Sequence, residues 1–66
     1  MIIIGKFHVE LDQESDAKTE SRSGYKFEDI EMAKNVMNDL VKSVKNFKRG
    51  YFELFVNDQS VFKKTV

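Results

Sequence analysis

The first stretch of the chain alternates between apolar and polar positions. Residues 2 to 12 read IIIGKFHVELD, and a period of two places every second side chain on the same face of an extended chain. One face would carry Ile3, Gly5, Phe7, Val9 and Leu11, and the other Lys6, His8, Glu10 and Asp12. The alternation predicts a β-strand with one face toward a core and the other toward solvent.

The following segment, residues 13 to 24, has no large apolar side chain. It reads QESDAKTESRSG and contains a single alanine, so it cannot contribute to a core. Two interpretations stay open for residues 13 to 26. They form a loop, or they form in part a polar edge strand, from about Thr19 to Lys26, that pairs with the first strand as a hairpin.

From Phe27 to Arg49 the period changes to that of a helix. The apolar residues recur at spacings of three and four, at Ile30, Ala33, Met37, Leu40, Val44 and Phe47, with Val36 and Val41 widening the stripe. This pattern predicts one amphipathic helix of about six turns. Its charges suit the helix dipole, with Glu28, Asp29 and Glu31 at the start and Lys45, Lys48 and Arg49 at the end. Gly50 would then end the helix in the left-handed conformation.

The last part of the chain predicts a hairpin. Two β-rich runs, 51 to 57 and 61 to 66, flank Asn57-Asp58-Gln59-Ser60, which has turn-forming residues at both ends. The sequence leaves two registers open. A two-residue loop would pair Val56 with Val61 and Glu53 with Lys64, and a three-residue loop would pair Val56 with Phe62 and Phe52 with Val66.

These elements, in the order ββαββ, predict a single α+β domain over residues 1 to 66. One long helix would pack across one face of a three- or four-stranded, mostly antiparallel sheet. The predicted core contains Ile3, Phe7, Val9, Leu11, Ile30, Ala33, Val36, Met37, Leu40, Val44, Phe47, Phe52, Leu54 and Val56.

The opposite side of the predicted sheet keeps more apolar surface than a solvated face usually carries. It would present Ile2, Ile4, Tyr51 and Phe55. A chain of 66 residues buries only about 60% of its unfolded surface, so association would add stability. We therefore expect an unidentified protein partner or a second copy of the chain there, and predict a homodimer through this face or a sheet edge.

The formal net charge is zero, but the charges are unevenly distributed along the chain. Residues 1 to 33 hold four basic and eight acidic side chains, and residues 34 to 66 hold seven and three. A basic cluster, consisting of Lys42, Lys45, Lys48, Arg49, Lys63 and Lys64, could neutralise phosphates while Tyr51 or Phe55 stacks on bases. The alternative is ordinary solvated surface, because lysines are common at helix ends and on edge strands.

The stretch KRGYFELFV, residues 48 to 56, partly matches the RNA-binding strand of RNA-recognition domains. Arg49, Gly50 and Tyr51 fit that motif, but Glu53 stands where a second stacking ring is needed. Phe52 also occupies the position of a small residue, and an RNA-recognition domain needs two helices. We therefore interpret this stretch as the end of a helix followed by a core strand.

Catalytic, metal and cofactor chemistry finds little support. The chain has one histidine and no cysteine, and lacks a nucleophile elbow, a phosphate-binding glycine loop and a zinc-protease motif. His8, Glu10 and Asp12 share a strand face, but neighbours two apart diverge instead of converging on a metal. The spacing of Asp12, Glu14 and Asp16 imitates a calcium loop, whose required Gly and Glu are replaced here by Ala17 and Ser23.

We therefore expect a non-catalytic protein with no metal and no cofactor. The apolar run MIII is too short for a signal peptide or a membrane span, which predicts a cytoplasmic protein without a membrane partner. A composition rich in Phe, Ile, Asn and Lys is typical of A+T-rich bacterial or phage genomes. The favoured hypothesis is a small protein-binding or regulatory module, acting through the apolar sheet face or the acidic segment from Glu10 to Glu20. The alternative is a nucleic-acid-binding module that uses the basic cluster.

Overall fold

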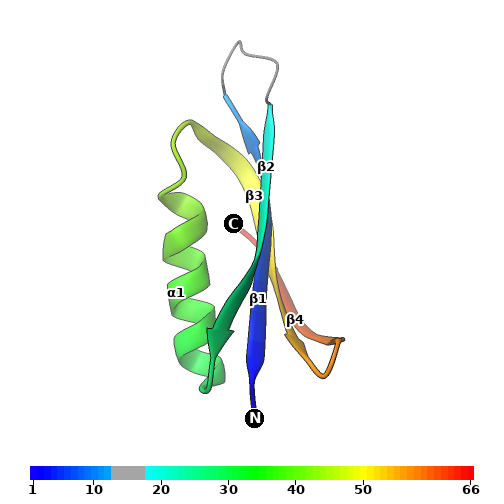
Figure 1. Cartoon of the computed structure of the whole chain (residues 1–66). Helices are drawn as coiled ribbons and strands as arrows, with labels where there is room; N and C mark the ends of the chain where they lie inside the picture. Colours follow the sequence, from blue (N-terminus) through cyan, green and yellow to red (C-terminus); the bar gives the residue numbers. More distant parts are fainter. Residues whose placement is uncertain (13–17) are drawn as a thin grey trace.

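The computed structural model, which describes residues 1–12 and 18–66, has two layers (Figure 1). The elements are β1 (Ile3–Leu11), β2 (Thr19–Phe27), α1 (Ile30–Lys42), β3 (Phe47–Val56) and β4 (Gln59–Thr65). In the described part of the chain the four strands form one antiparallel sheet in the order β2-β1-β3-β4. The helix packs on one face of this sheet, which confirms the predicted α+β class and shows that residues 19 to 27 form the edge strand.

The helix is about half as long as its apolar stripe predicted. It begins after Asp29, whose carboxylate accepts a hydrogen bond from the Met32 N–H at 2.8 Å. It ends at Lys42, where the Ser43 hydroxyl donates to the Leu40 carbonyl at 2.8 Å. The predicted extension to Arg49 is wrong, because Asn46 adopts a left-handed φ of 65° and turns the chain into β3.

Gly50 does not end the helix, as the sequence had suggested, but lies within β3 opposite Val9. A Cβ atom on Gly50 would stand 2.4 Å from the backbone carbonyl oxygen of His8 and 2.8 Å from the Cα of Val9. Only glycine lets the two central strands approach this closely. The stretch KRGYFELFV is therefore strand throughout, and its interpretation as a helix end is corrected.

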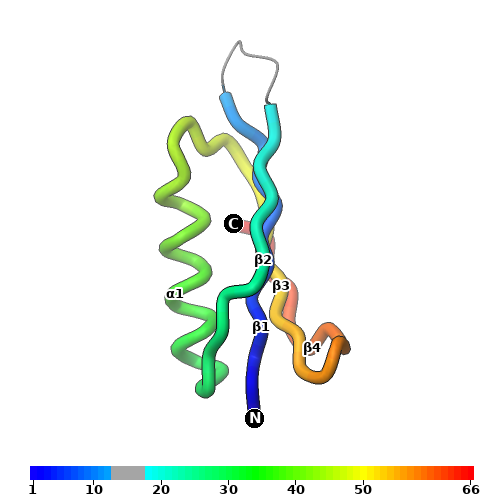
Figure 2. The backbone as a smooth tube through the Cα atoms, viewed as in Figure 1, coloured from blue at the N-terminus to red at the C-terminus, as the bar shows by residue number. Residues whose placement is uncertain are grey.

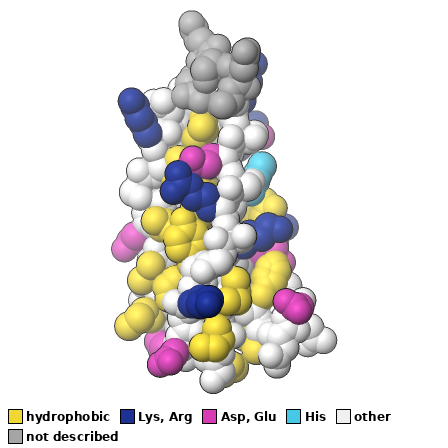
Figure 3. All heavy atoms as spheres, viewed as in Figure 1, with side chains coloured by type: hydrophobic (Ala, Val, Ile, Leu, Met, Phe, Trp, Pro, Cys, Tyr) yellow, Lys and Arg dark blue, Asp and Glu magenta, His cyan; other side chains and the backbone are white. Residues whose placement is uncertain are grey.

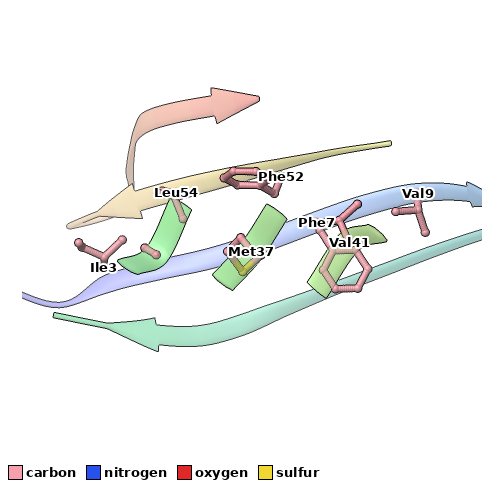
Figure 4. Packing of buried hydrophobic residues seen from close by; sticks show 8 residues of the cluster. Ile3, Phe7, Val9, Met37, Val41, Phe52 and Leu54 are labelled. Carbon is pink, nitrogen blue, oxygen red and sulfur yellow. The ribbon is translucent and has the colours of Figure 1, made fainter. Parts of the chain in front are cut away.

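The core lies between α1 and the sheet (Figure 4). Its buried residues are Ile3, Phe7 and Val9 from β1, Phe52 and Leu54 from β3, and Ala33, Met37 and Val41 from α1. Val41 replaces Val36 of the predicted core. Because the buried helical residues follow each other at intervals of four, Val36 falls outside this line and is 42% exposed. The other predicted core residues, such as Leu40 and Phe47, are partly buried around the cluster.

The hairpin adopts neither of the two predicted registers. Asn57 and Asp58 form a two-residue loop with φ values of 51° and 65°, and Val56 pairs with Gln59. Such positive φ values at both positions are typical of the turn that best fits a twisted hairpin, and Asn and Asp tolerate them. Past an unpaired Val61 the register shifts, so that Glu53 pairs with Lys63.

Val61 is one of three residues that the strand registers leave unpaired, together with Gly24 in β2 and Lys48 in β3. Each is a β-bulge, which bends its strand and increases the local twist. Gly24 has a φ of 91°, a value that suits glycine. The strands accordingly curve along their length (Figure 2).

Candidate functional site

The face of the sheet that points away from α1 is left uncovered by the described residues, as Figure 1 shows. We call it the open face and define it by strand register and alternation. Its central strands contribute Ile4, Lys6, His8 and Glu10 from β1 and Arg49, Tyr51, Glu53 and Phe55 from β3. Its edge strands add Thr19, Ser21, Ser23 and Lys26 from β2 and Ser60, Lys63 and Thr65 from β4.

The centre of the open face is an aromatic pair that joins the two middle strands. Tyr51 on β3 is opposite His8 on β1, with ring centroids 5.9 Å apart and a tilt of 36°. The His8 Nδ1 is 2.6 Å from the Ser21 hydroxyl, and the Lys63 ammonium lies 4.3 Å from the centre of the Tyr51 ring. Tyr51 is thus held in place by its neighbours and has a cation over its ring.

Both carboxylates on the open face have basic neighbours. Glu10 accepts a hydrogen bond from the Arg49 guanidinium. This bond is the main reason that the pKa of Glu10 is lowered. Desolvation opposes it, and the nearby positive charges of Arg49 and Lys48 lower the pKa further. Glu53 lies in register between Lys6 on β1 and Lys63 on β4. A lone carboxylate on this face would repel phosphates, and these two lysines offset that repulsion.

The open face therefore carries a net positive charge although the chain as a whole is neutral. Its four basic side chains (Lys6, Lys26, Arg49 and Lys63) outnumber its two carboxylates, which leaves a formal charge of +2. All four basic side chains are exposed. A surface of this sign can attract polyanions by local contact.

A second aromatic ring lies farther along β3. Phe55 is half-buried on the open face and lies opposite Ile4 of β1, four residues from Tyr51. At about 3.3 Å per residue, the two rings are roughly 13 Å apart. Between them lies the row formed by Lys6, Glu53 and Lys63. Along β3, the open face therefore presents the Tyr51 ring, then the charged row, and then the Phe55 ring.

The structure divides the predicted basic cluster between different surfaces. Arg49 and Lys63 lie on the open face, whereas Lys64 pairs with the buried Phe52 and lies on the helix side. Lys42 is the last residue of α1 and Lys45 is in the following turn, while Lys48 is the bulged residue of β3. The six side chains therefore do not form one site.

Two basic residues of the open face, Lys6 and Lys26, were absent from the predicted nucleic-acid contacts. For Lys6 a signal existed, because the alternation of the first strand already separated it from the core residues. Lys26 could be placed only by its pairing with Ile4. The sequence left open whether that segment is a strand at all.

Three of the four predicted partner-face residues share the open face, namely Ile4, Tyr51 and Phe55. Ile2 does not join them. It precedes β1 and lines a depression beside Phe27 and Met32, near the start of α1. Ile4 and Phe55 are neighbours in register, but the row formed by Lys6, Glu53 and Lys63 separates them from Tyr51, so the open face has no continuous apolar surface.

A different depression, of about 390 Å³, lies on the helix side between α1 and β2. Apolar residues such as Phe7, Leu11 and Leu40 line it, and Arg22 bridges Glu20 across 3.2 Å at its edge. Figure 3 shows hydrophobic side chains gathered on this side of the molecule. No buried side-chain nitrogen or oxygen among the described residues lacks a hydrogen-bond partner, so we assign no chemistry to this depression.

Residues 1–12 and 18–66 contain no group of three His, Cys, Asp or Glu side chains arranged to hold a metal ion. Of the three residues considered for such a site, His8 contacts Ser21 and Glu10 bonds to Arg49. Most of the calcium-like spacing, and the middle of the acidic segment, fall in residues 13–17, outside the described residues. No helix in the part of the chain that the structure describes has the length and apolar character needed to cross a bilayer.

The fold and the open face together define a small ββαββ domain with a mixed aromatic and basic surface on the uncovered side of its sheet. Comparison with known proteins found no family model that matches the chain, no similar curated protein and no similar solved structure.

Proposed function

We propose that this protein is a non-catalytic module that binds single-stranded nucleic acid on the open face. The observation that carries this proposal is the position of Tyr51, next to His8 and Lys63 at the centre of an uncovered, net positive sheet. Unpaired bases stack on exposed aromatic rings, and neighbouring lysines and arginines contact the phosphates. The sequence alone favoured a protein-binding module. We now prefer nucleic-acid binding because the basic side chains outnumber the carboxylates on the open face.

A single strand fits this surface better than a duplex. A broad sheet face cannot enter the major groove, which admits a helix or a two-stranded ribbon. The two rings, Tyr51 and Phe55, are roughly 13 Å apart, which is several times the 3.4 Å spacing of stacked bases along one strand. They would therefore hold bases that are not adjacent, with Lys6, Lys63 and Arg49 available to the phosphates around them.

The test is fluorescence anisotropy of labelled single-stranded DNA and RNA of about 12 nucleotides, titrated with the protein at about 50 mM and about 150 mM salt. The chain provides a matched pair of variants, since Lys63 and Lys64 are adjacent in β4 but lie on opposite faces of the sheet. We expect Lys63→Glu to weaken binding roughly three- to tenfold, and Lys64→Glu to leave it nearly unchanged.

A second variant tests the stacking ring itself. Tyr51→Leu keeps an apolar side chain but removes the ring, and stacking contributes about 1–3 kcal/mol per base, or roughly 5- to 150-fold in Kd. Circular dichroism would verify that each variant is folded. The proposal is wrong if no oligonucleotide binds even at the lower salt concentration, or if the Lys63 and Lys64 variants lose the same affinity.

The homodimer and the protein partner predicted from the sequence stay predictions. A dimer formed by stacking two open faces would bury Lys6, Glu53 and Lys63 of both copies, which is costly for unpaired charges. It would also occupy the surface that we assign to nucleic acid. The two uses of the open face would therefore compete.

A further inference from the structure

Glu53 is the one carboxylate of the open face with no partner among the residues that the structure describes. Glu10, the other, is bonded to Arg49, whereas Glu53 makes neither a hydrogen bond nor an ion pair there. It is half-buried and lies midway along β3 between Tyr51 and Phe55, roughly 7 Å from each. Its two oxygen atoms are available to a ligand on the open face.

On the basis of the proposed function, we infer that Glu53 selects guanine among the bases that contact the open face. An ionised carboxylate only accepts hydrogen bonds, and two parallel bonds require two donors side by side. The Watson–Crick edge of guanine offers such a pair, its N1–H and its N2 amino group. Unpaired bases on protein surfaces are commonly read along this edge.

The other bases offer a less favourable edge to a carboxylate. Adenine and cytosine each place one amino donor beside a ring nitrogen that accepts, so the second carboxylate oxygen would face a lone pair. Thymine and uracil present one N–H between two carbonyl oxygens. Each therefore gives one good hydrogen bond at most, together with an unfavourable contact. Guanine alone satisfies both carboxylate oxygens.

The neighbours of Glu53 make this selection compatible with a polyanionic ligand. Lys6 and Lys63 flank it on the two adjacent strands, so phosphates that approach the row meet two ammonium groups beside one carboxylate. Tyr51 and Phe55, one on each side along β3, would hold the bases next to the selected one. Stacking supplies affinity for any sequence, and Glu53 would add the preference for one base.

The experiment measures anisotropy with a thymine oligonucleotide that carries one central guanine, adenine, cytosine or inosine, and with its RNA counterparts. Inosine keeps the N1–H donor of guanine but lacks the N2 amino group. We expect the guanine ligand to bind at least about fivefold more tightly than the adenine and cytosine ligands, with inosine in between. The Glu53→Gln variant should lose this order while binding the all-thymine ligand at least as well, because a negative charge is removed.

Glu10→Gln is the matched control, since it neutralises the other carboxylate of the same face. It should keep the guanine preference. If the protein binds every oligonucleotide with equal affinity, or if Glu53→Gln keeps the preference, the role of Glu53 is overturned and nucleic-acid binding stands. If no oligonucleotide binds, both the role of Glu53 and the proposed function fail.

Discussion

At the scale of single residues, two glycines of the central strands differ in what surrounds them. The missing Cβ of Gly50 would meet β1 backbone, 2.4 Å from the His8 carbonyl oxygen. That of Gly5 would meet the Met37 side chain, 2.7 Å from its sulfur atom. A methionine side chain is flexible and can move aside, whereas a paired backbone cannot. The two positions therefore offer a direct comparison.

We predict that Gly50→Ala lowers the free energy of unfolding by about 1–3 kcal/mol, and that Gly5→Ala lowers it by less. Urea denaturation followed by circular dichroism measures both. Equal losses would show that the close approach of β1 and β3 at Gly50 is not the constraint we describe. An unchanged urea midpoint for Gly50→Ala would also show that the close approach of β1 and β3 does not require glycine at this position.

At the scale of the elements, the ion pair between Glu10 and Arg49 connects the two central strands next to the bulge at Lys48. The bond from Arg49 lowers the pKa of Glu10 in the folded chain below its ordinary value of 4.5. A carboxylate with a lowered pKa stabilises the fold above its unfolded pKa, and this contribution disappears as the pH falls through the folded value.

We therefore predict that wild-type protein is more stable than Glu10→Gln near neutral pH. The difference should shrink as the pH falls below about 4.5 and vanish below the lowered pKa. Thermal unfolding at low ionic strength across this range measures it, since the pair is exposed and screened by salt. In an Arg49→Gln background, Glu10→Gln should have a smaller effect. A constant difference at all pH values would contradict the assignment.

Strands and helix differ in how well the pattern of the sequence predicted their limits. The alternation in β1 was sufficient because this strand has one face on the helix and one in solvent. The end of α1 was missed because Val44 and Phe47 continue the helical spacing. Both pack against the core, but from a turn and from β3. Periodicity records which residues face the core and cannot tell which element carries them.

For the candidate site too, the sequence pattern predicts which face a residue occupies but not which residues of neighbouring strands lie beside it. That Lys6 and His8 share a face follows from alternation alone. Their contacts with neighbouring strands depend on the strand order and on three bulges, which shift the registers. The hairpin is an example, because the bulge at Val61 sets Lys63 opposite Glu53 and Lys64 opposite Phe52. No short-range signal in the sequence specified that shift.

At the scale of the whole molecule, the chain is neutral, but basic side chains outnumber carboxylates on the open face. The formal charges of the 66 residues cancel, so beyond a Debye length of about 8 Å the protein exerts little net attraction on a polyanion. The excess on the open face acts only at contact. Nucleic-acid binding should therefore be modest, within the range of about 10⁻⁴–10⁻⁶ M that is typical of non-specific complexes.

The salt dependence of binding counts the phosphate contacts on this face. Each contact with a single strand contributes about −0.7 to the slope of log K against log salt concentration. If Lys6, Arg49 and Lys63 each neutralise one phosphate, we predict a slope of about −2, and about −3 if Lys26 also takes part. Lys63→Glu should bring the slope at least about 0.7 closer to zero, and Lys64→Glu should leave it unchanged. A slope near zero would mean that the open face makes no phosphate contacts. A slope steeper than about −4 would mean that lysines on other surfaces bind as well.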